Sequence, residues 1–177
     1  QKIKEVNSGM YCFNKKFLLE NIENLDDNNN QNEIYLTDLI EIAFQNKLET
    51  VIVKVSEDTI KGVNSMSQLN DVEKTLREKL INSHMENGVY FQDTSTAFID
   101  ENVMIKAGAR IMANTHLTGT TEIHENCTVG PNTMINDSTI GSDSSVISSV
   151  LDGVTVKGQA VIGPYAHLRN GPVLEQD

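Results

Sequence analysis

Aliphatic residues recur at every sixth position along the second half of the chain. The members of this column are Ile99, Ile105, Ile111, Leu117, Ile123, Val129 and Ile135. An α-helix repeats about every 3.6 residues and a strand about every 2, so neither produces this spacing. A period of six predicts a repeat architecture of short units.

Four positions after each aliphatic residue comes a side chain that is small or short. This small column consists of Val103, Ala109, Thr115, Thr121, Cys127, Thr133 and Thr139. The two columns predict a left-handed parallel β-helix, in which three six-residue units close one triangular coil. The aliphatic residues point into the prism, and the coils stack at about 4.8 Å, the spacing of hydrogen-bonded strands.

The rhythm shifts by one residue at Ile140, continues to Val146 and resumes at Val156. We expect the interval between Val146 and Val156 to hold a shortened turn through Val150. The later aliphatic positions are Ile162, Leu168 and Leu174, with Ala160 and Ala166 in the small column. Because the repeat is still running at Asp177, we expect the chain to be part of a longer protein.

The first part of the chain predicts a strand over 3–13, helical spacing over 17–25, a helix over 32–47 and a buried strand over 50–55. The second helix has Thr37 or Asp38 as its candidate N-cap. Its predicted apolar face is Leu39, Ile40, Ala43 and Phe44. This order indicates the end of an α/β domain.

Residues 67–84 form the strongest helical pattern, because they are rich in Glu, Lys, Arg and Leu and lack Gly and Pro. At 1.5 Å per residue such a helix spans about 27 Å, enough for a rigid arm between domains. We expect the chain to leave this helix at Gly88 and continue into the first coil. The predicted apolar face is Leu69, Val72, Leu76, Leu80 and Ile81.

Composition narrows the function classes. A net charge of -11 disfavours nucleic acid and anionic membranes as partners, since phosphate binding needs clustered Lys and Arg. No signal peptide or apolar span of about 20 residues is present, so we expect a soluble cytoplasmic protein. Cys12 and Cys127 form no CxxC pair, and Cys127 is predicted to be a packed free thiol.

Several segments, taken in order, resemble one family. They are EVNSG (5–9), NEIYLTD (32–38), GVNS (62–65), the long helix and IGPYAHLRNG (162–171). The chain resembles the bifunctional bacterial N-acetylglucosamine-1-phosphate uridyltransferase/glucosamine-1-phosphate acetyltransferase family. The resemblance implies the end of a Rossmann-like uridyltransferase domain at 1–66, a helical linker at 67–87, and the first coils of a left-handed β-helix acetyltransferase domain at 88–177.

The resemblance also implies roles for three residues. Asn7 is expected to bind the sugar nucleotide, Asn64 to bind both the nucleotide and Mg²⁺, and Arg169 to bind the amino-sugar phosphate. No catalytic residue is expected within the chain. Two departures from the family pattern are Ser8, where Thr is usual, and Asn170, which makes LRNG out of the usual LRPG and bears on how Arg169 is aimed.

The implied function is the synthesis of UDP-N-acetylglucosamine for the cell wall by a homotrimer. One domain acetylates glucosamine 1-phosphate with acetyl-CoA, and the other transfers UMP from UTP and releases pyrophosphate. The chain alone is expected to be inactive. Two alternatives stay open at this stage: another sugar-phosphate nucleotidyltransferase with a β-helix tail, and a non-catalytic trimerisation module.

The histidines offer a third possibility. The γ-type carbonic anhydrases, another left-handed β-helix family, bind zinc through histidines of adjacent coils, which brings His116 and His124 into consideration. The two occupy different columns, and no matching third ligand stands nearby in the sequence. His167, two residues before Arg169, is a candidate neighbour of that arginine.

Overall fold

The computed structural model describes residues 5–26, 33–56, 59–171 and 173–175. The chain divides into two compact units, Gln1–Gly62 and Val63–Asp177. The boundary falls in the loop before the long helix. None of the helices among the described residues has the length and apolar character needed to cross a membrane.

The first unit contains short helices. They are α1 (Lys15–Asn21), the 3₁₀-helix η1 (Ile22–Asn24) and α2 (Asp38–Gln45). Asn14 caps α1, because its Oδ1 accepts hydrogen bonds from the backbone N–H groups of Lys16 (3.0 Å) and Phe17 (3.3 Å). The predicted apolar face of α2 is only partly right, since Leu39 is buried whereas Phe44 is 81% exposed.

The two strands predicted in this unit are absent from its described residues. Residues 50–55 are irregular, and the side chains of Val51, Ile52 and Val53 are 73%, 80% and 76% exposed. A strand exists only with a neighbour to share its backbone hydrogen bonds, and the described residues of this unit supply no such ladder. The prediction of a buried strand at 50–55 is therefore wrong.

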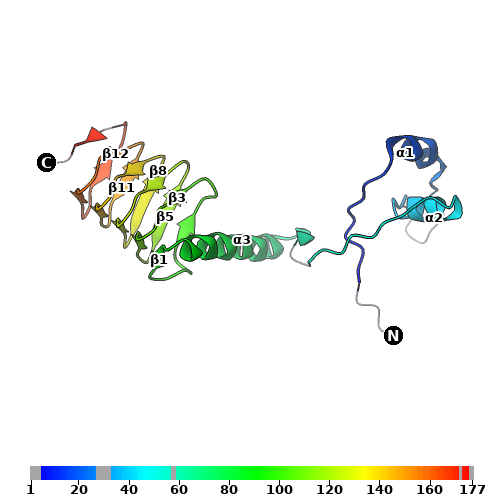
Figure 1. The fold of residues 1–177 in the computed structure, drawn as a ribbon, viewed down its shortest axis with the longest axis horizontal. Helices are drawn as coiled ribbons and strands as arrows, with labels where there is room; N and C mark the ends of the chain where they lie inside the picture. Colours follow the sequence, from blue (N-terminus) through cyan, green and yellow to red (C-terminus); the bar gives the residue numbers. More distant parts are fainter. Residues whose placement is uncertain (1–4, 27–32, 57–58, 172, 176–177) are drawn as a thin grey trace. The chain divides into compact units, whose positions relative to one another are not determined.

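The second unit is a parallel β-helix with three faces, each a five-stranded parallel sheet (Figure 1). Face A contains β1 (Tyr90–Phe91), β4 (Arg110–Ile111), β7 (Thr128–Val129), β10 (Ser145–Val146) and β13 (Val161–Ile162). Face B contains β2 (Phe98–Ile99), β5 (Thr115–Thr118), β8 (Thr133–Asn136), β11 (Val150–Asp152) and β14 (His167–Leu168). Face C contains β3 (Met104–Ile105), β6 (Glu122–Ile123), β9 (Thr139–Ile140), β12 (Thr155–Val156) and β15 (Val173–Leu174).

Each strand pairs with the strand three places further along the chain, so successive units turn from face to face around a prism. Ile99 pairs with Leu117, and Leu117 with Ile135, one coil apart. The seven aliphatic residues that recur at every sixth position are all buried, with exposed fractions between 0% and 8%. The predicted left-handed β-helix is confirmed, and its core is a stack of these side chains.

The turns after Ile135 differ from the prediction in detail. Leu151, not Val150, points inward, so the steps from Val146 to Leu151 and from Leu151 to Val156 are five residues each. The step from Ile135 to Ile140 is also five residues long, and it puts Ser138 in the small column. Thr139, the predicted member of that column, is instead half-buried at the surface.

Buried serines complete these shortened turns. The Oγ atoms of Ser138 and Ser149 accept hydrogen bonds from the backbone N–H groups of Val154 (2.9 Å) and Ala166 (3.1 Å) in the next coil. The same two hydroxyls donate to carbonyls of their own turns. A buried N–H without a partner is costly, so a hydroxyl at this position stabilises the shorter corner.

The C-terminal end of helix α3 (Met66–Glu86) packs against the first coil of the β-helix (Figure 1). Its Ile81 is buried in the same apolar cluster as the prism, whereas Leu76 is 60% exposed, so only the C-terminal part of the predicted apolar face packs. The helix ends in a Schellman motif: the N–H of Val89 donates to the His84 carbonyl (3.1 Å) and that of Gly88 to the Met85 carbonyl (3.0 Å). Gly88 has a φ of +86°, which glycine adopts without strain.

We expect His84 to make the stability of the second unit sensitive to pH. Its Nε2 is buried without a hydrogen-bond partner among the described residues, and burial lowers the pKa of the imidazole. As the pH falls below about 6.5, the histidine is therefore protonated in the unfolded chain before it is protonated in the folded chain. The free energy of unfolding is at its full value above this pH and decreases below it, by at most about 1.4 kcal/mol per pH unit. We expect urea unfolding at pH 5.5 and 7.5 to show this loss.

The control for that measurement is the exposed His167. His84→Gln should flatten the pH dependence of the unfolding free energy between pH 5.5 and 7.5, and His167→Gln should leave the dependence in place. An unchanged profile in His84→Gln would contradict this origin of the pH effect.

Candidate functional site

Asn7 lies in an exposed turn that its own side chain organises. Its Oδ1 accepts a hydrogen bond from the Gly9 N–H (3.0 Å), and its Nδ2 donates to the Tyr11 hydroxyl. Gly9 has a φ of +74°. The amide predicted to bind a sugar nucleotide is thus accessible, and a ligand would replace the local partners of both its donor and its acceptor.

Asn64 immediately precedes the N-cap of α3. The Ser65 Oγ accepts a hydrogen bond from the Gln68 N–H (3.2 Å), while the Gln68 Oε1 accepts one from the Asn64 N–H (2.7 Å). This reciprocal arrangement is similar to a capping box and fixes the backbone of Asn64. Its exposed side-chain amide makes no hydrogen bond to other described residues, so its oxygen is available to a ligand.

Arg169 follows β14 and is exposed. The next two residues, Asn170 and Gly171, have φ values of +70° and +73°. A proline ring holds φ near about -65°, so the turn seen here differs from the one that an LRPG sequence would make. Asn170, directly after Arg169, therefore has a backbone conformation that proline could not adopt.

Within the second unit, Asn64 and Arg169 are not brought together. Asn7 belongs to the first unit, whereas Asn64 and Arg169 stand at opposite ends of the second. The 21 residues of α3 span about 32 Å at 1.5 Å each, and the stacked coils lie beyond them. The sequence prediction had already assigned Asn7 and Asn64 to one site and Arg169 to another.

A polar ladder on face B was missed by the sequence analysis. The Thr118 hydroxyl donates to the Asn136 Oδ1 (2.9 Å), and the Asn136 Nδ2 donates to the Asp152 Oδ1 (2.8 Å). These residues line a shallow cavity of about 230 Å³, with His116 at one end and His167 at the other. Each ladder residue directly follows an inward aliphatic residue, so alignment of successive coils would have revealed it.

His116 and His124 lie on different faces. The His116 ring stacks on Phe98 with centroids 4.7 Å apart, and the Arg77 guanidinium lies 4.4 Å from the centre of the same phenyl ring. His124 follows β6 on face C. Its Nε2 lies 3.7 Å from a carboxylate oxygen of Glu122, and its Nδ1 lies 3.9 Å from one of Glu125. Within the described part of the chain, no group of three or more His, Cys, Asp or Glu side chains could hold a metal ion.

Cys127 is a packed thiol in the small column, as predicted. Its Sγ lies 3.2 Å from the Gly141 carbonyl oxygen of the next coil and acts as a weak donor. Burial raises the pKa of this thiol, which keeps it protonated and unreactive at neutral pH. Cys12, in the first unit, is exposed.

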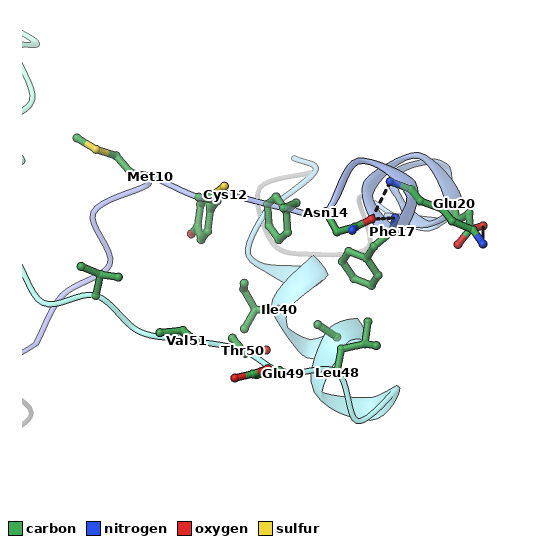
Figure 2. Close-up of a pocket in the computed structure, with 15 residues that line it drawn as sticks. Met10, Cys12, Asn14, Phe17, Glu20, Ile40, Leu48, Glu49, Thr50 and Val51 are labelled. Carbon is green, nitrogen blue, oxygen red and sulfur yellow. Dashed lines mark hydrogen bonds and ion pairs between the residues drawn. The ribbon is translucent and has the colours of Figure 1, made fainter.

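A cavity of about 840 Å³ in the first unit is lined mostly by apolar side chains (Figure 2). Phe17 of α1, Ile40 of α2 and Val51 of the segment after α2 face it, and the Asn14 side chain beside it is already used to cap α1. Lys16, Glu20 and Glu49 add charged groups to this lining, and none of the three sequence-predicted site residues belongs to it.

The fold and the six-residue column define a hexapeptide-repeat protein of the left-handed β-helix class. A sequence profile of the family described as "Bacterial transferase hexapeptide (six repeats)" matches residues 102–137, which run from β3 to β8. This match concerns the β-helix alone.

The similarity to whole proteins extends further. The chain is 40% identical over 168 residues to the bifunctional protein GlmU of Clostridium novyi (strain NT), covering 95% of this chain and 37% of that protein. It is 40% identical over 177 residues to the same-named protein of Fervidobacterium nodosum, covering 99% of this chain and 38% of that protein. The chain spans a little over a third of the length of these relatives.

Proposed function

We propose that this chain is part of a bifunctional enzyme that synthesises UDP-N-acetylglucosamine. The observation that carries the proposal is that the similarity to GlmU proteins covers 95% to 99% of the chain. It includes the first unit and α3 as well as the coils. A simple trimerisation module would need to match only the coils.

In the acetyltransferase reaction, the amine of glucosamine 1-phosphate attacks the thioester carbonyl of acetyl-CoA, and the CoA thiolate leaves. A general base accepts the amine proton, and no residue of this chain is assigned that role. The proposed part of Arg169 is to bind the phosphate of the amino sugar, because its planar guanidinium offers two parallel N–H donors to phosphate oxygens. Its exposed position beside β14 suits contact with a ligand.

In the uridyltransferase reaction, a phosphate oxygen of N-acetylglucosamine 1-phosphate attacks the α-phosphorus of UTP, and pyrophosphate leaves. Asn7 would hydrogen-bond the sugar nucleotide through its amide, and Asn64 would contact the nucleotide. A bound Mg²⁺ neutralises phosphate charge in such a transfer. The free amide oxygen of Asn64 fits one position of an ion that keeps several waters, so it would be one ligand among others.

The proposal extends to organisation and location. Residues 1–66 would be the end of the uridyltransferase domain, 67–87 the linker, and 88–177 the first coils of the acetyltransferase domain. The protein would be a cytoplasmic homotrimer that supplies peptidoglycan synthesis and so affects cell shape. The arm-like α3, of which only the C-terminal part packs on the coils, is consistent with a linker.

Two separate assays of the complete natural protein that carries this chain test the proposal. We expect pyrophosphate release from UTP and N-acetylglucosamine 1-phosphate, and CoA release from acetyl-CoA and glucosamine 1-phosphate. The 177-residue chain alone should be inactive in both. Activity with ATP or dTTP instead of UTP would favour another nucleotidyltransferase, and activity in neither assay would favour a trimerisation module.

A further inference from the structure

The chain contains two Asn-Gly pairs, Asn87-Gly88 and Asn170-Gly171. Asparagine is one of the thermolabile residue types, because the backbone nitrogen of the following residue can attack its side-chain amide. A glycine in the following position favours the attack, since it has no Cβ to hinder the approach. The two pairs therefore have the same local chemistry, and their surroundings in the fold decide which of them reacts.

Hydrogen bonds hold the first pair in the C-terminal cap of α3. The Asn87 Nδ2 donates to the Ser83 carbonyl (2.9 Å), and the Asn87 N–H donates to the same carbonyl (3.2 Å). The Gly88 N–H donates to the Met85 carbonyl (3.0 Å). The amide that would leave and the nitrogen that would attack are both engaged, so a reaction at Asn87 requires the cap of the helix to open.

The second pair is held by no comparable contacts. Asn170 and Gly171 are both exposed. Neither the Asn170 side chain nor the Gly171 N–H makes a hydrogen bond to another residue that the structure describes. Asn170 has a φ of +70°, a left-handed conformation that is unfavourable for a residue with a Cβ. Rotation out of this conformation, which ring closure requires, is therefore not opposed by the backbone.

We propose that Asn170 is a site of spontaneous deamidation. The Gly171 nitrogen loses its proton to a base in solution and attacks the side-chain carbon Cγ of Asn170. A bond forms between this nitrogen and Cγ, the bond from Cγ to Nδ2 breaks, and Nδ2 takes up a proton and leaves as ammonia. Water then opens the resulting five-membered succinimide at either of its carbonyls. The product is aspartate or isoaspartate, and no oxidant or reductant is consumed.

The modification changes the residue directly after Arg169. It adds one negative charge, and isoaspartate also lengthens the main chain, which then runs through the former side-chain carbon. The effect on activity rests on the proposed function, in which Arg169 binds the phosphate of an amino sugar. We expect deamidation to raise the KM for glucosamine 1-phosphate about 3-fold, the effect of one like charge at about 7 Å in water.

Peptide mapping of the complete natural protein that carries this chain tests the proposal. The folded protein is kept at mildly alkaline pH and physiological temperature, and tandem mass spectrometry follows the exchange of NH₂ for OH at each asparagine. We expect Asn170 to convert at least about 10-fold faster than Asn87, because the reaction at Asn87 must first break several hydrogen bonds. Labelling by isoaspartyl methyltransferase should mark residue 170 and not residue 87.

Two controls separate the effect of the fold from that of the local sequence. In urea both pairs lose their surroundings, so Asn87 and Asn170 should convert at similar rates. Asn170→Gln keeps a side-chain amide but would have to close a larger ring, which is slower. This variant should show no conversion at residue 170 over the same time, and its acetyltransferase KM should stay at its own starting value.

Three results would overturn the proposal: a folded protein in which Asn170 stays unconverted, one in which Asn87 converts equally fast, or a ratio of the two rates that urea leaves unchanged. Conversion is read from the mass and is independent of catalysis. If Asn170 converts while the KM for glucosamine 1-phosphate stays constant, the modification site stands and the proposed role of Arg169 is contradicted.

Discussion

Gly141→Ala is expected to lower the unfolding free energy of the β-helix by about 3 kcal/mol, at the upper end for overpacking a close-packed site. A Cβ at this position would lie 2.5 Å from the Lys157 carbonyl carbon and 2.7 Å from the Val156 carbonyl oxygen of the next coil. Both atoms belong to the backbone, so no side-chain rotation relieves the contact. The Gly141 N–H also donates to that Val156 carbonyl (2.8 Å), so the two coils would separate where they are hydrogen-bonded. Urea unfolding followed by circular dichroism measures the loss.

Two other glycines provide controls for this substitution. Gly153 has a φ of +65° but no close neighbour, and a Cβ there would meet only the Gly171 nitrogen at 3.8 Å. Gly153→Ala should therefore show backbone strain alone, about 1 kcal/mol. Gly62, in the loop before α3, has nothing within 4 Å of a built Cβ, so Gly62→Ala should be close to neutral. Equal losses at Gly141 and Gly153 would refute the close approach as the cause.

The six-residue column could be predicted because the β-helix is a local repeat. Each inward position, such as Ile111 or Ile123, is set by the spacing along the chain and needs no knowledge of distant residues. The side chains of one coil pack on equivalent side chains of the next, so the period specifies both the strand and its partner. This is why the architecture followed from the sequence.

The details of the corners were harder to predict because a five-residue and a six-residue step differ by one position. Ser138 and Thr139 are both short and polar, and either suits the small column by type. The choice is made by the hydrogen bond from the Val154 N–H to the Ser138 hydroxyl, which joins residues 16 positions apart. Such a contact is visible only once the coils are stacked.

The first unit shows a different limit. The β-branched run at 50–55 has strand propensity, but propensity acts only where a neighbouring strand completes the ladder. In the described residues Val51 and Val53 instead border the apolar cavity beside α1 and α2. The roles of Asn7 and Asn64 came from family resemblance, because an asparagine in a turn or before a helix is usually structural.

Arg169→Ala is expected to lower the acetyltransferase kcat/KM of the complete natural protein about 100-fold and to leave its uridyltransferase activity unchanged. A charge-assisted hydrogen bond contributes about 1.5 to 3 kcal/mol, which corresponds to roughly a 10- to 150-fold change. Arg169→Lys should recover only part of the loss, because an ammonium lacks the two parallel donors of the guanidinium.

The matched control for Arg169 is Lys106→Ala, which removes one exposed positive charge from the end of β3 on face C. If loss of net positive charge alone weakened phosphate binding, both variants would lose activity to a similar degree. We expect the Lys106 variant to keep normal acetyltransferase kinetics, because a charge on another face is screened by solvent.

Asn170→Pro tests the direction in which the Arg169 side chain points and leaves its charge unchanged. A proline cannot adopt the φ of +70° that Asn170 has, so this change should re-aim Arg169 and alter the KM for glucosamine 1-phosphate while the chain remains folded. Normal acetyltransferase kinetics in Arg169→Ala would remove Arg169 from the substrate site.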